Sequence, residues 1–204
     1  MNREKLTESL RAHGFGVRYF ETAAQATQFL QETLHGKTIG IGGSETVRQM
    51  GLDRALAQDN TVYWHWDAQQ VQQHGGAGAV RDLAAQAEVY LCSANAVAET
   101  GELVNIDGTG NRIAATAYGH QQVFFVVGVN KVTETLERAM WRARNVAAPK
   151  NARRLNRKTP CAQLADRCYD CSSPERICNG FLILARPMTG CDMTVILIGE
   201  ELGA

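Results

Sequence analysis

The chain has 204 residues, of which 45 % are hydrophobic and 21 % are charged. Its 21 basic and 21 acidic residues cancel, so the overall charge gives no attraction to nucleic acid or to an anionic membrane. No apolar run approaches the roughly 18 residues of a membrane span, and the charged N-terminus "MNREKLTESLRAHG" lacks the apolar core of a signal peptide. We therefore expect a globular cytoplasmic protein with no membrane or nucleic-acid partner.

The predicted elements alternate between helix and strand along the chain. A helix is expected over 4–13, a strand over 15–20, and a second helix that begins after Thr22 and ends at Gly36. The remaining predicted strands are 37–41, 61–66, 88–93, 122–129 and 194–199, with helical segments near 67–86 and 133–147. This alternation favours an α/β fold with a mostly parallel sheet and helices on both faces.

The composition changes after Met140, where "WRARNVAAPKNARRLNRK" leads through Pro149 and Pro160 into a segment rich in cysteine. We predict one α/β domain over 1–204 that includes a small cysteine-bearing C-terminal appendage over 149–192. The strand at 194–199 then returns to the main sheet.

The first candidate ligand site is the glycine turn "GIGGSET" between a predicted strand and a predicted helix. Free backbone amides at such a turn can hold phosphate or carboxylate oxygens, with ligand-binding roles for Gly42, Gly43, Ser44 and Thr46. The alternative is a tight turn in which Ser44 only caps the helix. The turn lacks the last glycine of a dinucleotide fingerprint and the lysine of a P-loop, so a nucleoside triphosphatase is not expected.

Two further loops follow predicted strands. "SANAVAETGELVNIDGTGNR" at 93–112 is rich in polar groups, and open α/β sheets bind ligands beyond their strand ends. We predict ligand-binding roles there for Asn95, Asn105 and Asp107, and Glu99 is the candidate catalytic carboxylate. The alternative is a hairpin turn at "IDGTGN" with solvated acidic groups.

The third loop contains Asn130 and Lys131, which follow the apolar strand "QVFFVVGV". A lysine at this strand end can neutralise an anionic ligand, although an isolated loop lysine can also be merely solvated. We predict that both residues bind the ligand.

Five segments together resemble the stand-alone LUD-domain proteins, known as lactate-utilisation proteins. They are "GGSETVRQMG", "ANAVAETGELVNIDGTGNR", "VGVNKVTETLERAMWRARNVAAPKNARR", "PCAQLADRCYDCSSPERICN" and "VILIGEELG". The resemblance implies a Rossmann-like sheet similar to that of the sugar-phosphate isomerase and CoA-transferase superfamily. In that superfamily strand-end loops hold anionic substrates, and the binding groups are a glycine loop, acidic residues and a lysine. By position, the resemblance implies that the corresponding site residues lie in 42–46, 95–107 and 130–131. The resemblance does not identify the reaction.

Four cysteines cluster near the C-terminus in the pattern C-x6-C-x2-C-x6-C: Cys161, Cys168, Cys171 and Cys178. Cytosolic cysteine clusters serve metal binding or redox chemistry more often than stable disulfides. We predict a four-thiolate site for zinc or an iron–sulfur cluster, since the spacing does not choose between them. A redox-active or disulfide pair and inert packing are the alternatives. Cys92 and Cys191 are interpreted as buried apolar residues.

The stretch 138–158 carries eight basic residues and no acidic one. Some of these cations lie near a predicted helix C-terminus, where positive charge suits the helix dipole. The others, Arg153, Arg154, Arg157 and Lys158, could bind phosphate, CoA or a partner protein, with RNA the least favoured. His65 is interpreted as a strand residue and Trp66 as a core or interface residue.

These observations predict a protein that handles a small anionic metabolite in organic-acid or lactate oxidation, as an oxidoreductase subunit with a cysteine-bound metal or iron–sulfur cluster. The alternative is a non-catalytic subunit in which a structural zinc site accompanies a basic surface that docks a redox partner protein. A homo-oligomer is compatible with both hypotheses.

Overall fold

The computed structural model describes residues 2–204. Its centre is a six-stranded sheet in which all neighbouring strands are parallel. The spatial order is β1 (Gly16–Phe20), β10 (Asp192–Ile198), β7 (Gln122–Gly128), β4 (Val89–Cys92), β2 (Thr38–Ile41) and β3 (Thr61–Trp64). The last strand of the chain lies between β1 and β7, with Ile196 in register with Arg18 and Val126. The sheet is therefore complete only when β10 is in place, and the predicted fold class is confirmed.

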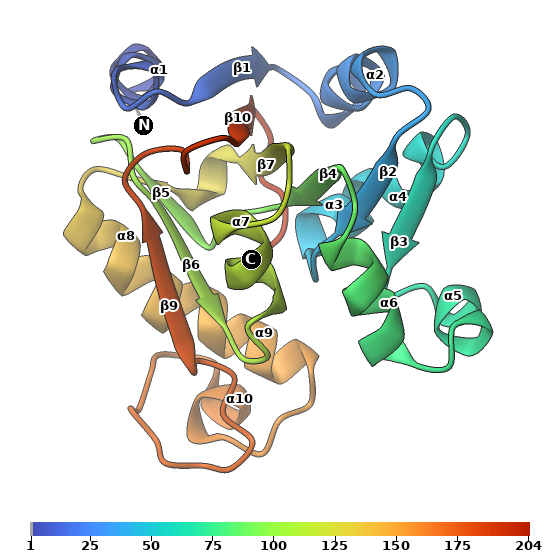
Figure 1. Ribbon diagram of the computed structural model, residues 1–204. Helices are drawn as coiled ribbons and strands as arrows, with labels where there is room; N and C mark the ends of the chain where they lie inside the picture. Colours follow the sequence, from blue (N-terminus) through green and yellow to red (C-terminus); the bar gives the residue numbers. More distant parts are fainter. Residues whose placement is uncertain (1) are drawn as a thin grey trace.

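Helices cover both faces of this sheet (Figure 1). On one face α2 (Ala23–Thr33), α3 (Glu45–Met50) and α4 (Leu52–Leu56) pack their apolar side chains against Ile39, Ile41 and Val126. On the other face α1 (Arg3–Ala12) and α7 (Asn111–Ala117) pack against Tyr90 and Phe125. Burial of these apolar surfaces is the main driving force for the fold.

Close packing of a helix on the sheet depends on Gly40 in β2. A Cβ atom at this position would lie 2.2 Å from the carbonyl oxygen of Ala84 in α6 (Ala77–Ala85). The predicted helical segment 67–86 is divided into α5 (Ala68–Gln73) and α6, because Gly75 and Gly76 have φ values of +79° and +133° that end the first helix.

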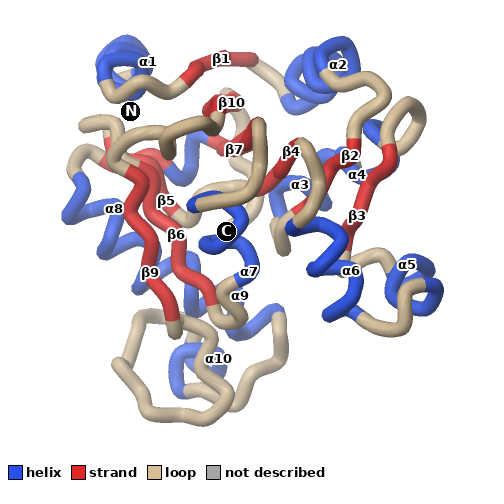
Figure 2. Tube along the Cα trace, in the orientation of Figure 1, coloured by secondary structure: helices blue, strands red, loops and turns tan. Residues whose placement is uncertain are grey.

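A second, four-stranded sheet was not predicted. Its order is β8 (Val132–Thr133), β5 (Ala96–Ala98), β6 (Leu103–Asp107) and β9 (Gly180–Leu184), drawn in red in Figure 2. The residues interpreted as a polar loop thus contain two short buried strands, and "IDGTGN" leads into α7 and does not form a hairpin.

A continuous helical rod packs on the outer side of the small sheet, through Ala139, Ala143 and Ala148. It comprises α8 (Leu136–Arg142), a π-helical turn (Ala143–Ala147) and α9 (Ala148–Arg154). Pro149 lacks an N–H group for the regular helical ladder, and a π turn precedes it. The helix therefore runs through the predicted start of the appendage at 149. The cysteine segment follows with the short helix α10 (Pro160–Leu164), and β9 pairs with β6.

None of the helices in residues 2–204 is long and apolar enough to cross a membrane.

Candidate functional site

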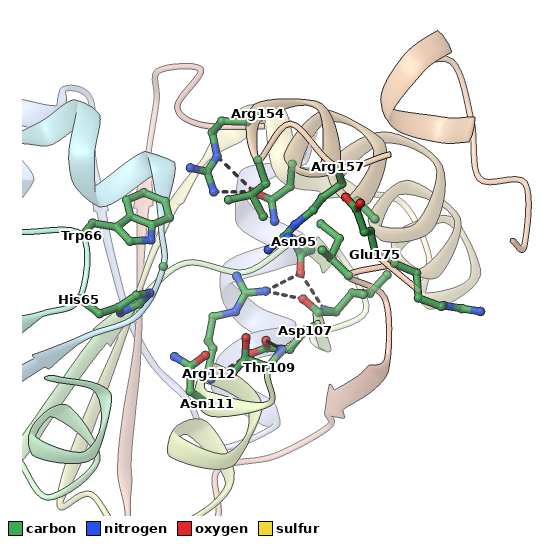
Figure 3. A pocket seen from close by; sticks show the side chains of 18 of the residues that line it. His65, Trp66, Asn95, Asp107, Thr109, Asn111, Arg112, Arg154, Arg157 and Glu175 are labelled. Carbon is green, nitrogen blue, oxygen red and sulfur yellow. Dashed lines mark hydrogen bonds between the residues drawn. The ribbon is translucent and has the colours of Figure 1, made fainter. Parts of the chain in front are cut away.

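The carboxyl ends of the central strands open onto a cavity of about 320 Å³, within the usual size range of small-molecule sites. Figure 3 shows His65 and Trp66 on one side, the loop from Asp107 to Arg112 on another, and Arg154 and Arg157 across from them. The site lies where ligands bind in open α/β sheets, beyond the strand ends.

Five arginines line this cavity, which we call the arginine pocket: Arg81, Arg112, Arg154, Arg157 and Arg176. Among residues 2–204 none of them forms an ion pair with a carboxylate within 4.0 Å. The Nε atoms of Arg81 and Arg176 are also buried without a hydrogen-bond partner. Arg154 and Arg157 are exposed and the other three arginines are half-buried, and the carboxylates of Asp107 and Glu175 line the same cavity. Because a buried donor without an acceptor is costly, the two buried Nε atoms and the exposed guanidinium groups suit a negatively charged ligand.

Arg112 is held in place from two strand-end loops. Its Nη2 atom donates to the Asn95 side-chain oxygen at 3.0 Å and to the carbonyl oxygen of Ile106. The same Asn95 oxygen accepts from the Ile106 amide at 2.7 Å. Asn95 therefore lines the pocket, and its side-chain oxygen orients the guanidinium group of Arg112. Its role in binding a ligand stays a prediction.

Arg154 comes from the last turn of α9 and reaches across to the loop after β3. Its guanidinium carbon lies 4.3 Å from the centre of the Trp66 ring, and its Nη2 atom donates to the Asn151 side-chain oxygen at 2.7 Å. Stacking on an indole leaves the edge of the guanidinium group accessible to an acceptor.

The histidine and tryptophan beyond β3 line the pocket. The interpretation of His65 as a strand residue is wrong, whereas Trp66 packs partly buried against the core, as its interpretation allowed. The predicted strand 61–66 ends at Trp64, which moves His65 and Trp66 into the loop. Burial is the main cause that lowers the pKa of His65 to about 4, and its buried Nδ1 atom has no hydrogen-bond partner in residues 2–204. His65 is therefore a neutral hydrogen-bonding group near pH 7.

The residues of the glycine turn have different roles in the structure. Gly43 borders the pocket, where a Cβ atom would lie 3.2 Å from the Trp66 ring, whereas Gly42 packs against Tyr90. Ser44 caps α3 by accepting from the Val47 amide at 3.2 Å, and it also lines a smaller cavity beside Lys131, so its ligand-binding role stays a prediction.

Lys131 is buried beside the arginine pocket, with 4 % of its surface exposed. Its ammonium nitrogen lies 2.7 Å from the Thr46 hydroxyl and 2.9 Å from the Ser93 hydroxyl. It lines a smaller cavity of about 70 Å³, the lysine cavity, together with Arg112 and Asn95. The structure thus brings Thr46 and Lys131 together from two of the predicted loops.

Asn130 and Arg142 fix the loops around Lys131. Asn130 accepts from the Leu202 amide at 3.1 Å, so its side chain holds segment 202–204 over the site. Arg142 is buried and donates to the carbonyl oxygens of Asn130 and Asn95. Burial lowers the pKa of Arg142, which lies in the last turn of α8.

Asp107 and the side-chain oxygen of Asn105 accept structural hydrogen bonds, whereas the Asn105 Nδ2 atom is buried and has no partner within residues 2–204. The Asp107 carboxylate accepts from four backbone amides, two in the turn that follows it and two at the start of α7. Asn105 is 1 % exposed, and its side-chain oxygen accepts from the Asn95 amide at 3.3 Å. Of the two, Asp107 lines the arginine pocket.

Glu99 lies in a different cavity, which it lines with Arg138, Trp141 and other residues outside the arginine pocket. The Asn2 amide donates to its carboxylate at 2.6 Å, and the Lys5 ammonium group lies 3.7 Å away. The structure therefore does not bring Glu99 together with the other candidate residues. Its catalytic role stays a prediction that our proposal does not use.

The four clustered cysteines line a single small cavity of about 10 Å³, the cysteine cavity: Cys161, Cys168, Cys171 and Cys178. Arg144 donates to the Cys168 sulfur at 3.4 Å, and Arg176 donates to the Cys178 sulfur at 3.4 Å. All six cysteines of the chain are free thiols. Within residues 2–204 no group of three or more His, Cys, Asp or Glu side chains is arranged to hold a metal ion.

The cysteine cavity and the arginine pocket are neighbours, because Ala148, Arg176 and Ile177 line both. The basic residues that precede the cysteines contribute both to the cysteine segment and to the arginine pocket. Arg153 donates to the carbonyl oxygens of two residues in the cysteine segment, whereas Arg154 lines the pocket.

The fold and the pocket define an α/β domain with a cationic site at the carboxyl ends of its parallel strands. The LUD domain family matches residues 3–198, and the chain therefore belongs to this family. The structure is also similar to the crystal structure of a DUF162 family protein from Deinococcus radiodurans, with a TM-score of 0.51 and 12 % identity over 96 % of this chain and 94 % of that chain. At this identity the likeness shows the fold alone. None of the curated proteins matched the chain.

Proposed function

We propose that this LUD domain protein binds a small anionic metabolite in the arginine pocket and handles it there in organic-acid metabolism. The observation that carries the proposal is the set of five arginines around one cavity that have no ion pair with a carboxylate among residues 2–204. Arginine presents a planar fork of donors that matches carboxylate and phosphate groups. A ligand with one or two such groups would satisfy the unpaired donors.

The positions of Arg112 and Arg154 favour a ligand that spans the pocket between them. Arg112 is fixed by Asn95 and the strand-end backbone, and Arg154 is fixed by Trp66 and Asn151. Donors that are already oriented lose less conformational entropy when the ligand binds.

Thermal unfolding with a panel of anions tests this function. The panel contains lactate, pyruvate, inorganic phosphate, a sugar phosphate and CoA. We expect stabilisation by at least one of them, and each of Arg112→Gln and Arg154→Gln should weaken that binding by about 10- to 100-fold, the loss of one charge-assisted hydrogen-bonding group. Arg11→Gln, on an exposed position of α1, is the matched control. Equal stabilisation of all four proteins would contradict the proposal.

A second candidate role concerns the cysteine cavity, where we propose that the four thiols bind zinc or an iron–sulfur cluster. Their convergence on one cavity supports this proposal. The donor chemistry suits either cofactor, although the sulfurs would have to move closer together to share one ion. An iron–sulfur cluster would supply electron transfer beside the pocket, whereas zinc would have a structural role in a subunit that docks a redox partner.

Metal analysis with an absorption spectrum of anaerobically purified protein separates these alternatives. Iron with sulfide favours the redox role, and zinc alone favours the structural role. Cys168→Ser and Cys171→Ser should each lose the metal and become protease-sensitive within 155–180, because metal binding stabilises such segments. Cys191→Ser, outside the cavity, is the control. Unchanged metal content and protection in both variants would mean that these cysteines only pack.

A further inference from the structure

Lys131 has an unusual environment for a buried lysine. Its nitrogen contacts the Thr46 and Ser93 hydroxyls at 2.7 and 2.9 Å, and within residues 2–204 no carboxylate lies within ion-pair distance of it. Buried charged side chains are normally paired with an opposite charge. Two hydroxyl partners suit an uncharged amine, because each hydroxyl can either accept from the nitrogen or donate to its lone pair.

The charges around Lys131 also favour the uncharged amine. Burial lowers the pKa of Lys131 to about 7, and the nearby guanidinium groups of Arg142 on α8 and Arg112 on α7 add to this effect. Glu45 on α3 acts in the opposite direction. Cys92 on β4 does not supply a negative charge near pH 7, because burial raises the pKa of its thiol to about 12.

The amine lies beside the proposed anion site. The lysine cavity shares six lining residues with the arginine pocket: Gly43, Trp66, Asn95, Arg112, Asn151 and Arg154. Arg112 therefore faces both cavities. An anionic group held by Arg112 would leave the rest of a small molecule next to the Lys131 nitrogen.

We propose that Lys131 is a nucleophile that forms an imine with a carbonyl compound whose anionic group is held by Arg112. This inference rests on the proposed function, since the arginine pocket supplies the anion site. The nitrogen lone pair adds to the carbonyl carbon, and the carbonyl oxygen takes up a proton. The resulting carbinolamine loses that oxygen as water, so C=N replaces C=O without any change of oxidation state. The Thr46 and Ser93 hydroxyls orient the nitrogen and can pass its protons.

Borohydride trapping tests the proposal directly. The full-length protein is incubated with glyoxylate or pyruvate, reduced with sodium borohydride and analysed by intact mass and peptide mapping. We expect one reduced adduct on Lys131. Its initial rate of formation should rise about tenfold between pH 6 and pH 8, as the fraction of uncharged amine increases around a pKa near 7.

Lys150 provides the internal control, because it lines the same lysine cavity but is exposed. Lys150→Arg should keep the adduct, and Lys131→Arg should lose it. Mapping in the wild-type protein decides the question even where Lys131→Arg fails to fold. An adduct on Lys150 or on surface lysines alone would overturn the proposal.

The two proposals can fail separately. Anions that stabilise the protein through Arg112 and Arg154, combined with no adduct on Lys131, would refute the imine and leave the anion site intact. No stabilisation by any anion, with no effect of Arg112→Gln on trapping at Lys131, would refute the anion site.

Discussion

Lys131 and Asp107 were both predicted to bind a ligand, but their surroundings give them different roles. Four backbone amides occupy the Asp107 carboxylate, so its negative charge stabilises the loop and the start of α7. Within the described part of the chain, residues 2–204, the Lys131 nitrogen has only hydroxyl hydrogen-bond partners, so it remains available for chemistry. Position in the sequence made both residues candidates for ligand binding. Only their hydrogen-bond partners distinguish the structural role of Asp107 from the available nitrogen of Lys131.

The buried lysine should make protein stability depend on pH. Because the pKa of Lys131 is lowered from 10.5 to about 7 in the native protein, the unfolded chain binds this proton more tightly above pH 7. The free energy of unfolding should therefore rise with pH, by about 1.4 kcal/mol per pH unit from this group between about pH 7 and about pH 9. The contribution is lost as the pH falls through this range and stays constant below it.

Lys131→Met removes this contribution, because methionine does not titrate. Urea unfolding of both proteins at about pH 6, 7, 8 and 9 measures the effect. We expect the wild-type protein to gain stability relative to the variant above pH 7 and a constant difference below it. Parallel pH profiles would show that Lys131 titrates normally.

At the scale of elements, the long regular segments were predictable and the short ones were not. The strands of the central sheet have continuous apolar runs, and Thr22 caps α2 as expected, in a capping box with Gln25. In contrast, β5 has three residues and β8 has two. Strands this short have no readable period, and they form because the rod from α8 to α9 covers them. Pro149 had suggested a boundary at this point, but the π turn (Ala143–Ala147) joins α8 and α9 into one helical rod.

Two glycines near α6 give a matched test of how this helix packs. Gly40→Ala places a Cβ atom 2.2 Å from the Ala84 carbonyl oxygen, so α6 must move away from β2. We expect a loss of about 3 kcal/mol in the free energy of unfolding. Gly78→Ala, within α6 itself, meets no atom within 4 Å and should raise stability by up to about 1 kcal/mol. Denaturant unfolding measures both, and a neutral Gly40→Ala would contradict this packing.

At the scale of the whole molecule, the pocket joins segments that are far apart in the sequence. Trp66 follows β3, Arg112 begins α7, Arg154 ends α9 and Arg176 lies among the cysteines. Residues of the three predicted loops meet at one edge of the sheet, because parallel strands bring their carboxyl ends together. Arg112 lies in one of these loops, at 93–112, and could have been predicted from the sequence as a ligand-binding residue. Arg176 could not, because its position depends on the return of β9 to the small sheet.

Arg176 connects the two cavities and should affect both. It donates to the carbonyl oxygens of Cys171 and Cys178, and it also lines the arginine pocket. We expect Arg176→Gln to weaken anion binding by about tenfold and to increase protease cleavage within 161–178. Arg186→Gln, at an exposed position, is the control. A variant that changes neither property would show that Arg176 does not link the cysteine segment to the pocket.

Amide hydrogen exchange with and without the most stabilising anion tests most directly whether anions bind at the carboxyl edge of the main sheet. Binding should slow exchange in 43–46, 93–95, 107–112 and 151–157, the segments that surround Arg112, Arg154 and Lys131, because bound ligand suppresses local opening. The backbone amides around the surface cavity beside Gln25 and Phe29 should exchange at the same rate with and without the anion. An anion site at the carboxyl edge of the sheet would be contradicted if exchange slowed only around that surface cavity, or if it slowed in none of the four segments.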